Sequence, residues 1–381
     1  MDFALTEDEE RRRQALIEFA RRELDDDVVG RDARQEFPRE AWRRCAAFGV
    51  QGLPVPEEYG GTGAGPLTIA LAMEALGYGC EDNGLLFAVN TQMWACEIPI
   101  VRFGTEAQKR RYLPGLCDGS LVAGHAMTEP GSGSDAFSLT TTAVRDGDDF
   151  VLDGSKTFVT NAPVADVLVL FATTEPGTGF AGISAFLVDL PSPGVTVGPP
   201  VSKMGLRTAL MAEVVLRGCR VPSDRVLGRV GAGLAVFNLA MEWERSLVLA
   251  SSVGTMQRQL ERSVRYAKER RQFGRAIGSF QAVSNKLVDM KLRLETSRLL
   301  LYQLAWLMTA GRSRGPESAL AKLHLSESFV ASSLDAVQIH GGVGYLSDTG
   351  IERDVRDAIA SRIYSGTSQI QRSIVARHMG L

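Results

Sequence analysis

The sequence lacks the usual signatures of zinc, serine hydrolase and nucleoside triphosphatase sites. Its 381 residues include only four histidines, no two of them four positions apart, and no Cys-x-x-Cys pair, so a zinc site is not expected. The Gly-x-Ser-x-Gly nucleophile elbow is absent, and so is a Walker-type glycine loop. We therefore expect no bound metal and none of these three chemistries.

A strong charge of one sign and long apolar runs are missing as well. The net charge is −3 and no block is rich in lysine or arginine, which argues against a nucleic-acid partner. The N-terminus, MDFALTEDEERRR, has no apolar signal-peptide region, and no run of ~18 apolar residues predicts a membrane span. Five scattered cysteines are typical of reduced thiols, so we expect a cytoplasmic location.

Proline is scarce outside the middle of the chain. Eight of the 15 prolines lie between Pro130 and Pro222, and only Pro316 follows. Because proline reliably interrupts helices, the last third can be helical almost throughout. We expect a mainly α protein with a middle β domain, divided into a helical domain (1–120), a β domain (121–228) and a helical bundle (229–381).

Local signals place the predicted helices and strands. Capping boxes at Thr6 and Thr105 each begin a helix, the first reaching about Val28, and Pro66 suits the first turn of another that runs to about Leu76. Short β-branched or alternating runs predict strands at Phe150–Lys156, Val167–Thr173, Ile183–Val188 and Ala212–Val221. Apolar residues at three- and four-residue spacing predict four long helices at Gly233–Arg270, Gln281–Ala310, Glu317–Gln338 and Ile363–His378.

Three motifs could approach a flat or anionic ligand. The turn Ala126–Asp135 is rich in glycine and serine, and its backbone N–H groups could approach a ligand closely, or it could be an ordinary turn. Its Gly-x-Gly-x-x-Ala part is not a dinucleotide fingerprint, because no βαβ unit surrounds it. The glycines of Gln338–Tyr345 could form a helix cap or press against a cofactor. Arg270–Gly274 could interact with the helix dipole or grip a pyrophosphate.

A fourth motif could supply a base. Met241–Arg245 lies in an apolar helix and contains Glu242 and Glu244, which are about 200° apart around the axis, so at most one faces a given pocket. A carboxylate beside a buried apolar face tends to have a raised pKa, which suits a general base. A surface ion pair with Arg245 is the alternative.

Taken together, in this order and spacing, these motifs resemble the acyl-CoA dehydrogenase family over essentially the whole chain. Met127–Asp135 and Gln338–Asp357 are the specific matches, and Ile363–Arg372 is a third. The resemblance implies three domains: a helical one, a β-barrel-like one and a C-terminal four-helix bundle. It also implies a homotetramer that shares FAD between subunits and removes two hydrogens from the α and β carbons of an acyl thioester.

The resemblance also implies which residues bind FAD. Residues of the β domain and of the Ile363–Arg372 segment would contact the flavin, with Thr160 near its N5 atom. They are Met127, Thr128, Ser134, Phe158, Val159, Thr160, Thr367 and Gln369. Residues of a neighbouring subunit would hold the adenine and pyrophosphate end: Arg270, Gln272, Phe273, Gln281, Gln338, Gly341 and Gly342.

The sequence departs from the family at the catalytic base. Most members carry a glutamate where this chain has Ser365, and serine cannot remove an α-proton without a base beside it. A minority, resembling isovaleryl- and long-chain acyl-CoA dehydrogenases, place the base on the long helix directly before an arginine. Glu244 before Arg245 fits that arrangement, so Glu244 is the candidate base. Ser134, Arg245 and Ser365 are candidate substrate contacts.

Five short phrases resemble a smaller branch, the prolyl-carrier-protein dehydrogenases of antibiotic biosynthesis: residues 161–166, 241–245, 259–261, 298–302 and 364–368. Such enzymes oxidise L-prolyl on a peptidyl carrier protein toward pyrrole-2-carbonyl. A catabolic dehydrogenase of short or branched acyl-CoA is the alternative, and an inactive binding scaffold is another. The electron acceptor, an electron-transfer flavoprotein or oxygen, stays open.

Overall fold

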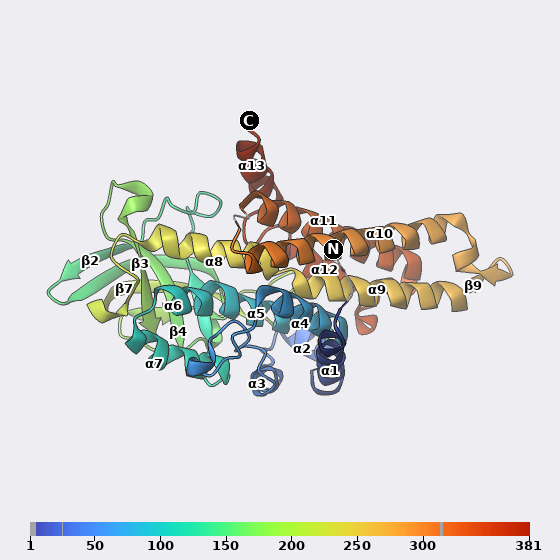
Figure 1. Cartoon of the computed structure of the whole chain (residues 1–381), viewed down its shortest axis with the longest axis horizontal. Coiled ribbons are helices and arrows are strands. Elements are labelled where there is room, and N and C mark those ends of the chain that lie inside the picture. Colours follow the sequence, from blue (N-terminus) through green and yellow to red (C-terminus); the bar gives the residue numbers. More distant parts are fainter. Residues whose placement is uncertain (1–4, 25, 313–314) are drawn as a thin grey trace.

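A computed structural model describes residues 5–24, 26–312 and 315–381 of the chain. Figure 1 shows an elongated molecule, with the sheet at one end and long helices that run to a small hairpin at the other. The predicted fold class is confirmed, because the strands of the main sheet all lie in the middle of the chain and helices precede and follow them.

Short helices form the N-terminal part. Both predicted capping boxes are present, at Thr6 and at Thr105. The first helix ends earlier than predicted, because the Asp27 side chain accepts a hydrogen bond from Gly30 and caps a new helix. The elements are α1 (Glu7–Glu23), α2 (Val28–Arg34), α3 (Arg39–Ala47), η1 (Glu57–Tyr59), α4 (Pro66–Gly79), α5 (Asn83–Gln92), the π-helical η2 (Met93–Glu97), α6 (Ile98–Phe103) and α7 (Glu106–Cys117).

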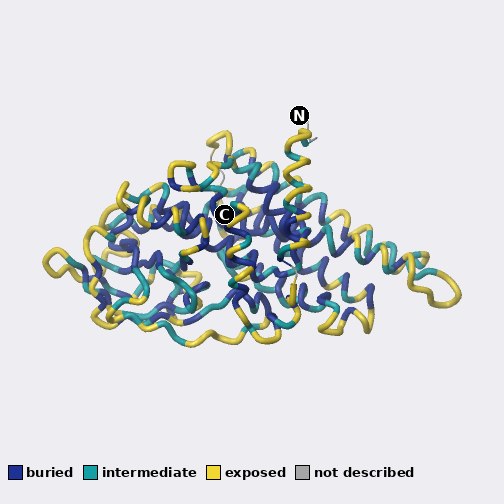
Figure 2. Tube along the Cα trace, turned by 90° about the horizontal axis from the view of Figure 1, so that it is seen from below, coloured by how far each residue is buried: buried dark blue, intermediate teal, exposed yellow. Residues whose placement is uncertain are grey.

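One continuous helical segment passes through the interior. Residues 83–103 comprise α5, η2 and α6. By length and composition alone this segment could cross a membrane, but 89% of its most apolar stretch is buried inside the protein. In Figure 2 buried backbone fills the centre of the molecule, and exposed backbone is concentrated at loops and tips. The segment has the burial of a core helix.

The β domain contains one eight-stranded sheet in the order β6-β7-β3-β2-β4-β5-β8, with β1 pairing parallel to β4. All four predicted strands are present: the one at Val167–Thr173 has the predicted bounds, two are longer by one or two residues, and the one predicted at Phe150–Lys156 extends to Thr160. The strands are β1 (Ala123–Ala126), β2 (Thr142–Asp146), β3 (Asp149–Thr160), β4 (Val167–Thr173), β5 (Ile183–Asp189), β6 (Val195–Val197), β7 (Met211–Pro222) and β8 (Val226–Leu227), with short turns η3 (Ala162–Val164), η4 (Gly179–Gly182) and η5 (Ser223–Arg225).

The C-terminal part corrects two predicted helices. The predicted helix 233–270 is two helices, because the chain bends at Val248 and Leu249. The predicted helix from Ile363 begins only at Ser368, because Ser365 and Gly366 have positive φ and Thr367 caps the next helix. The elements are α8 (Gly233–Leu247), α9 (Ala250–Glu269), β9 (Arg271–Gln272), β10 (Arg275–Ala276), η6 (Ile277–Ser279), α10 (Gln281–Thr309), α11 (Gly315–His340), η7 (Gly341–Tyr345), η8 (Ser347–Thr349), α12 (Ile351–Ala360) and α13 (Ser368–His378).

Two glycines allow the N-terminal helices to pack directly on the bundle. A Cβ on Gly77 of α4 would lie 1.8 Å from the Ser251 carbonyl oxygen, and one on Gly254 of α9 would lie 1.9 Å from that of Glu74. The backbones of α4 and α9 therefore touch, and a larger residue at either position would force them apart.

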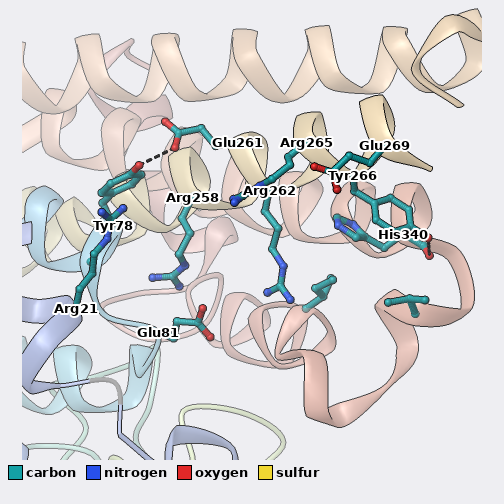
Figure 3. A pocket seen from close by; sticks show the side chains of 13 residues that line it. Arg21, Tyr78, Glu81, Arg258, Glu261, Arg262, Arg265, Tyr266, Glu269 and His340 are labelled. Atoms are coloured by element: carbon teal, nitrogen blue, oxygen red, sulfur yellow. Dashed lines mark hydrogen bonds between the residues drawn. The ribbon is translucent and has the colours of Figure 1, made fainter. Parts of the chain in front are cut away.

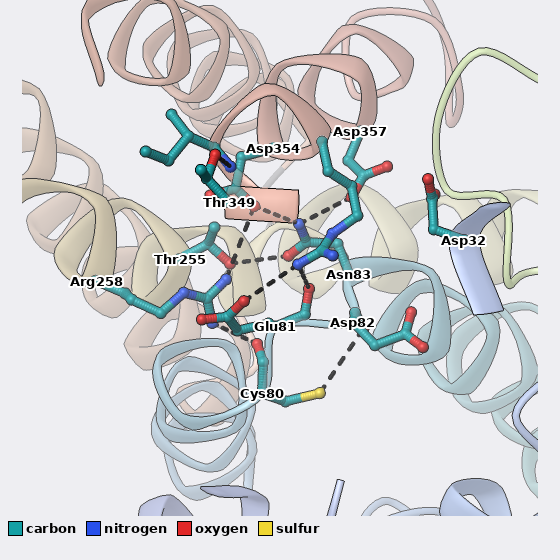
Figure 4. A network of polar contacts seen from close by, with 12 residues as sticks. Asp32, Cys80, Glu81, Asp82, Asn83, Thr255, Arg258, Thr349, Asp354 and Asp357 are labelled. Carbon is teal, nitrogen blue, oxygen red and sulfur yellow. Dashed lines mark hydrogen bonds and ion pairs between the residues drawn. The ribbon is translucent and has the colours of Figure 1, made fainter. Parts of the chain in front are cut away.

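A buried polar network holds α12 in place (Figure 4). Asn83, at the start of α5, donates to Asp354 at 3.0 Å and to Asp357 at 3.1 Å. Asp357 also accepts from the backbone N–H of Leu206 at 2.6 Å. Burial raises the pKa of Asp357 to about 7, although both donors and Arg353 oppose the rise. The N-terminal helices, the β domain and α12 thus meet at one carboxylate, just before the turn that bears Ser365.

Glu97, at the end of the π-helical turn, is a second buried carboxylate. Gln92 donates to one oxygen at 2.8 Å, and the other oxygen has no hydrogen-bond partner. Burial raises the pKa of Glu97 to about 8, against the lowering effect of Gln92. A π-turn at a buried position often lies at a functional site.

The Glu97→Gln variant tests this burial. In the folded wild type Glu97 keeps its proton up to about pH 8, whereas the unfolded chain loses it near the ordinary value, so the contribution of Glu97 to stability falls as pH rises between these values. Near pH 8 we expect the variant to be more stable than wild type by roughly a few kcal/mol in free energy of unfolding, which appears as a higher Tm. At pH 5 the two proteins should have similar Tm values. A pH-independent difference in Tm would contradict this assignment.

Candidate active site

Glu244 lies on α8 and is 7% exposed. The Ser365 hydroxyl donates to its carboxylate at 2.6 Å. Burial raises the pKa of Glu244, while the Ser365 hydrogen bond and the charges of Arg245 and Lys322 oppose the rise. The structure therefore brings together the two positions at which the family resemblance places a base, and only one of them, Glu244, is a carboxylate.

The turn that bears Ser365 has an unusual backbone. Ser365 has φ of +54°, a left-handed conformation that few non-glycine residues adopt, and Gly366 follows with φ of +90°. Two side chains bind its Ser365 carbonyl: Arg245 Nε donates to this oxygen at 3.2 Å, and Gln371 Nε2 donates to it at 3.0 Å. Arg245 therefore contacts this turn within the chain, a role that the sequence did not indicate.

Two pairs of aromatic side chains lie next to Glu244 or Ser365 along the chain or in the fold. Tyr364 and Phe87 lie with ring centroids 4.6 Å apart, and Trp94 of the π-turn stacks on Trp243, the residue before Glu244, at 6.0 Å. Sequence analysis missed Phe87, Trp94 and Tyr364, because they lie on three segments whose contact only the fold reveals. An apolar wall beside a carboxylate favours its neutral form and excludes water.

On the β side a buried ion pair supports the predicted flavin segments. Lys156 of β3 contacts Glu129 at 2.7 Å and donates to the Met127 carbonyl at 3.2 Å, and both charged side chains are essentially inaccessible. Burial opposes the charge of Glu129, but hydrogen bonds from Lys156 and from Thr140 and Thr141 lower its pKa to about 2. Burial lowers the pKa of Lys156, and the hydrogen bond and charge of Glu129 oppose the fall.

The pair joins the two β-domain segments that the resemblance assigns to FAD. The Thr157 N–H donates to the Thr128 carbonyl at 2.8 Å, so Met127 and Thr128 lie beside the end of β3. Phe158 has φ of +56° and is 64% exposed, where the register of β3 and β7 shifts. Val159 is buried and Thr160 is half-buried, while Ser134 is exposed in the turn.

The second predicted group lies at the other end of the bundle. Phe273, at the tip of the β9–β10 hairpin, is 92% exposed with φ of +51°. Tyr266 of α9 stacks on His340 at 4.4 Å, which places the end of α11 near the end of α9. Within one chain this end is remote from the sheet (Figure 1). The residues concerned are all exposed: Arg270, Gln272, Phe273, Gln281, Gln338, Gly341 and Gly342.

A cavity of about 510 Å³ lies along α9 and reaches His340 (Figure 3). Arg258, Arg262 and Arg265 line it, and acidic residues such as Glu81 alternate with them. Neither Glu244 nor any predicted site residue lines this cavity. Within the described ranges, no group of three or more histidine, cysteine, aspartate or glutamate side chains could hold a metal ion.

Comparisons with known proteins identify the family. Models of the acyl-CoA dehydrogenase N-terminal, middle and C-terminal domains match residues 6–120, 124–219 and 231–380. The chain belongs to the acyl-CoA dehydrogenase family. Like the family, it is an FAD-dependent oxidoreductase that acts on an acyl thioester.

Several relatives in this family are similar to the protein over nearly its whole length. The chain is 44% identical to an L-prolyl-[peptidyl-carrier protein] dehydrogenase of Pseudomonas fluorescens over 355 residues, 93% of each chain. The structure of the prolyl acyl carrier protein oxidase AnaB matches with a TM-score of 0.98 and 49% identity, over 99% of this chain and 100% of AnaB. PigA, solved with FAD and proline, matches with a TM-score of 0.98 and 41% identity over 100% of both chains.

The glycines of this dehydrogenase leave room for a bound cofactor. A Cβ on Gly131 or Gly133 in the turn, or on Gly341 or Gly342 after α11, would meet no atom of the chain within 4 Å. Internal packing therefore does not require glycine at these positions. An aromatic side chain exposed at Phe158 and open backbone around the glycines are what a flat, anionic cofactor needs.

Ser365→Ala tests the hydrogen bond to Glu244. The Ser365 hydroxyl favours the charged carboxylate, so its removal is expected to raise the pKa of Glu244 further. Flavin reduction by a thioester needs the ionised base, so its pH profile should shift to higher pH. Ser373→Ala, which removes an exposed hydroxyl from α13, is the control and should leave the profile unchanged. An identical profile for the Ser365 variant would refute the role of this hydrogen bond.

Lys156→Met tests the buried pair. The variant leaves Glu129 buried without its counter-charge, so we expect the free energy of unfolding to fall by about 3–5 kcal/mol. Urea unfolding of the FAD-free protein measures the loss. Lys291→Met removes an exposed partner of Glu295 and should cost at most about 1 kcal/mol. Equal losses in the two variants would contradict a special role for Lys156.

Proposed function

We propose that this protein oxidises an L-prolyl group, held as a thioester on a peptidyl carrier protein, toward pyrrole-2-carbonyl in antibiotic biosynthesis. The observation that carries the proposal is the pairing of a buried glutamate on α8 with a serine 2.6 Å away at the usual base position. Relatives named for prolyl carrier-protein substrates, alike over nearly their whole length, support this substrate.

The proposed reaction needs one base and one hydride acceptor. Glu244 takes the proton from the α carbon, and the apolar wall around it raises its affinity for that proton. FAD, when bound, supplies the acceptor for the hydride from the β carbon. Saturated prolyl and pyrrole differ by four hydrogens, so a second two-electron oxidation must follow at other atoms of the ring, since the α carbon no longer carries a hydrogen. Between the two oxidations Glu244 must lose its proton to solvent and the hydride acceptor must be reoxidised. Ser365 keeps the carboxylate oriented, while Ser134 and Arg245 face the substrate.

The cofactor site we propose follows the two groups of residues described above. Met127, Thr128 and Ser134 line one side of the flavin, and Phe158, Val159 and Thr160 flank its ring from β3. Thr367 and Gln369, at the start of α13, complete this group. The seven exposed residues at the hairpin end serve the adenine and pyrophosphate of a neighbouring subunit, in a homotetramer. The separation of the two groups within one chain supports this sharing.

Two properties extend the proposal. The five cysteines are all buried and none forms a disulfide bond, which supports a reducing, cytoplasmic location. The electron acceptor would be an electron-transfer flavoprotein or oxygen. A chain of the structure named for the electron-transferring flavoprotein of Acidaminococcus fermentans is 38% identical to this one, which favours the flavoprotein. An inactive scaffold would not need a buried glutamate in place of the usual base.

An anaerobic flavin-bleaching assay decides the substrate. Purified FAD-loaded protein is mixed with prolyl-loaded carrier protein and, separately, with short and branched acyl-CoAs. We expect rapid bleaching with the prolyl carrier alone. Bleaching by acyl-CoA and none by the carrier would replace the proposal with a catabolic dehydrogenase, and no bleaching by any thioester would favour the scaffold.

Glu244→Gln tests the base. The amide has nearly the same shape but cannot take a proton, so FAD binding should persist while substrate-driven flavin reduction falls by at least about 10³-fold. Glu242→Gln, on the same helix but about 200° around its axis, is the matched control. Full activity of the Glu244 variant would eliminate Glu244 as the base.

A further inference from the structure

Lys322 is a buried lysine that none of the motifs indicated. It lies on α11, is 1% exposed, and donates from Nζ to the Gly366 carbonyl at 2.8 Å. Burial lowers its pKa to about 8, although the nearby charge of Glu244 opposes the fall. Burying an ammonium group costs free energy unless the group gains strong partners, so a lysine at this position calls for a specific role.

Its partner is the strained turn beside the candidate base. Ser365 and Gly366 both have positive φ, and left-handed backbone at a serine costs of order 1–3 kcal/mol unless the surroundings fix it. Three buried or partly buried side chains from three helices converge on the two carbonyl oxygens of this turn. Arg245 reaches Ser365 from α8, Gln371 reaches both oxygens from α13, and Lys322 reaches Gly366 from α11.

We propose that Lys322 is a positioning residue of the dehydrogenase site, holding the Gly366 carbonyl so that the Ser365 hydroxyl stays on Glu244. The inference rests on the proposed function, in which Glu244 is the base. Lys322 binds the turn itself from α11, the helix that packs against α8, α9, α10, α12 and α13. Glu327 of the same helix binds Arg362 before the turn and Ser368 after it. The position of the Ser365 hydroxyl is therefore tied to the centre of the bundle and not only to its own segment.

Lys322 also carries a charge, and that effect must be separated from positioning. The charged and titratable groups around Glu244 are Arg245 on α8, Lys322 on α11, Tyr364 in the turn and Cys96 in the π-helical turn. Removing the ammonium charge raises the pKa of Glu244 and shifts the pH profile. Above that profile but below about pH 8, the base is ionised and wild-type Lys322 still carries its charge. The limiting rate in that range therefore reports the geometry of the site and not the ionisation of the base.

The experiment is Lys322→Met, with the limiting rate of flavin reduction measured on the FAD-loaded protein. Methionine keeps the volume but cannot donate, so we expect the limiting rate to fall about tenfold or more, the usual effect of losing a hydrogen bond from a charged group. FAD content and Tm report folding. Lys286→Met, which removes the partly exposed partner of Asp335 from α10, is the control and should retain the wild-type rate.

A double-mutant cycle with Ser365→Ala identifies the route of the effect. If Lys322 acts through the Ser365 hydroxyl, the double variant has the limiting rate of the Ser365 variant alone. The proposal would be overturned if the rate loss in the double variant equalled the product of the two single losses. A wild-type limiting rate in Lys322→Met would also overturn it. If the methionine variant does not fold, Lys322→Gln, a shorter neutral donor, replaces it in the same cycle.

A crystal structure of Lys322→Met gives a readout that does not depend on activity. We expect the Ser365 hydroxyl to lie beyond hydrogen-bond distance of Glu244, and an unchanged 2.6 Å contact would overturn the proposal. This separates two failures: no bleaching of the wild-type flavin by any thioester refutes the proposed function, whereas an unchanged turn in the variant refutes the role of Lys322.

Discussion

The interaction on which the site depends is the burial of the Glu244 carboxylate. A charge withdrawn from water must be compensated locally, and here the Ser365 hydroxyl, Arg245 and Lys322 compensate it from three segments. The compensation is incomplete, because burial still outweighs it and the pKa stays raised. A raised pKa means that the carboxylate, once ionised, binds a proton more strongly than an ordinary glutamate does, which suits a general base.

The same carboxylate also depends on contacts far from it. The turn at Ser365 follows α12, and α12 is fixed by Asp357, which binds Asn83 of α5 and the Leu206 backbone beyond β6. A Cβ on Gly205 would lie 2.2 Å from the Arg356 carbonyl oxygen, so the segment from the β domain passes directly against this helix. The three parts of the chain are thus locked together within one short stretch that ends at the active site.

The sequence alone predicted the fold class and four of the eight strands of the main sheet, because capping boxes, proline and β-branched runs are local signals. Glu244 was predicted through a family resemblance, since its own segment also fits a surface ion pair. The break at Val248 and the turn at Ser365 were missed, because neither contains a proline and both are set by packing against other helices. Lys322 was missed for the same reason: its partner is a backbone carbonyl 44 residues away.

The short distance between Ser365 and Glu244 bears on how a base can change position during evolution. The two side chains meet in one small volume, one from α8 and one from the turn, so the two positions that the family resemblance offers for a base are neighbours in space. Carboxylates at both positions would repel each other, and one of them would keep its proton. A longer side chain at position 365 would also have to accept the left-handed backbone that Ser365 has here.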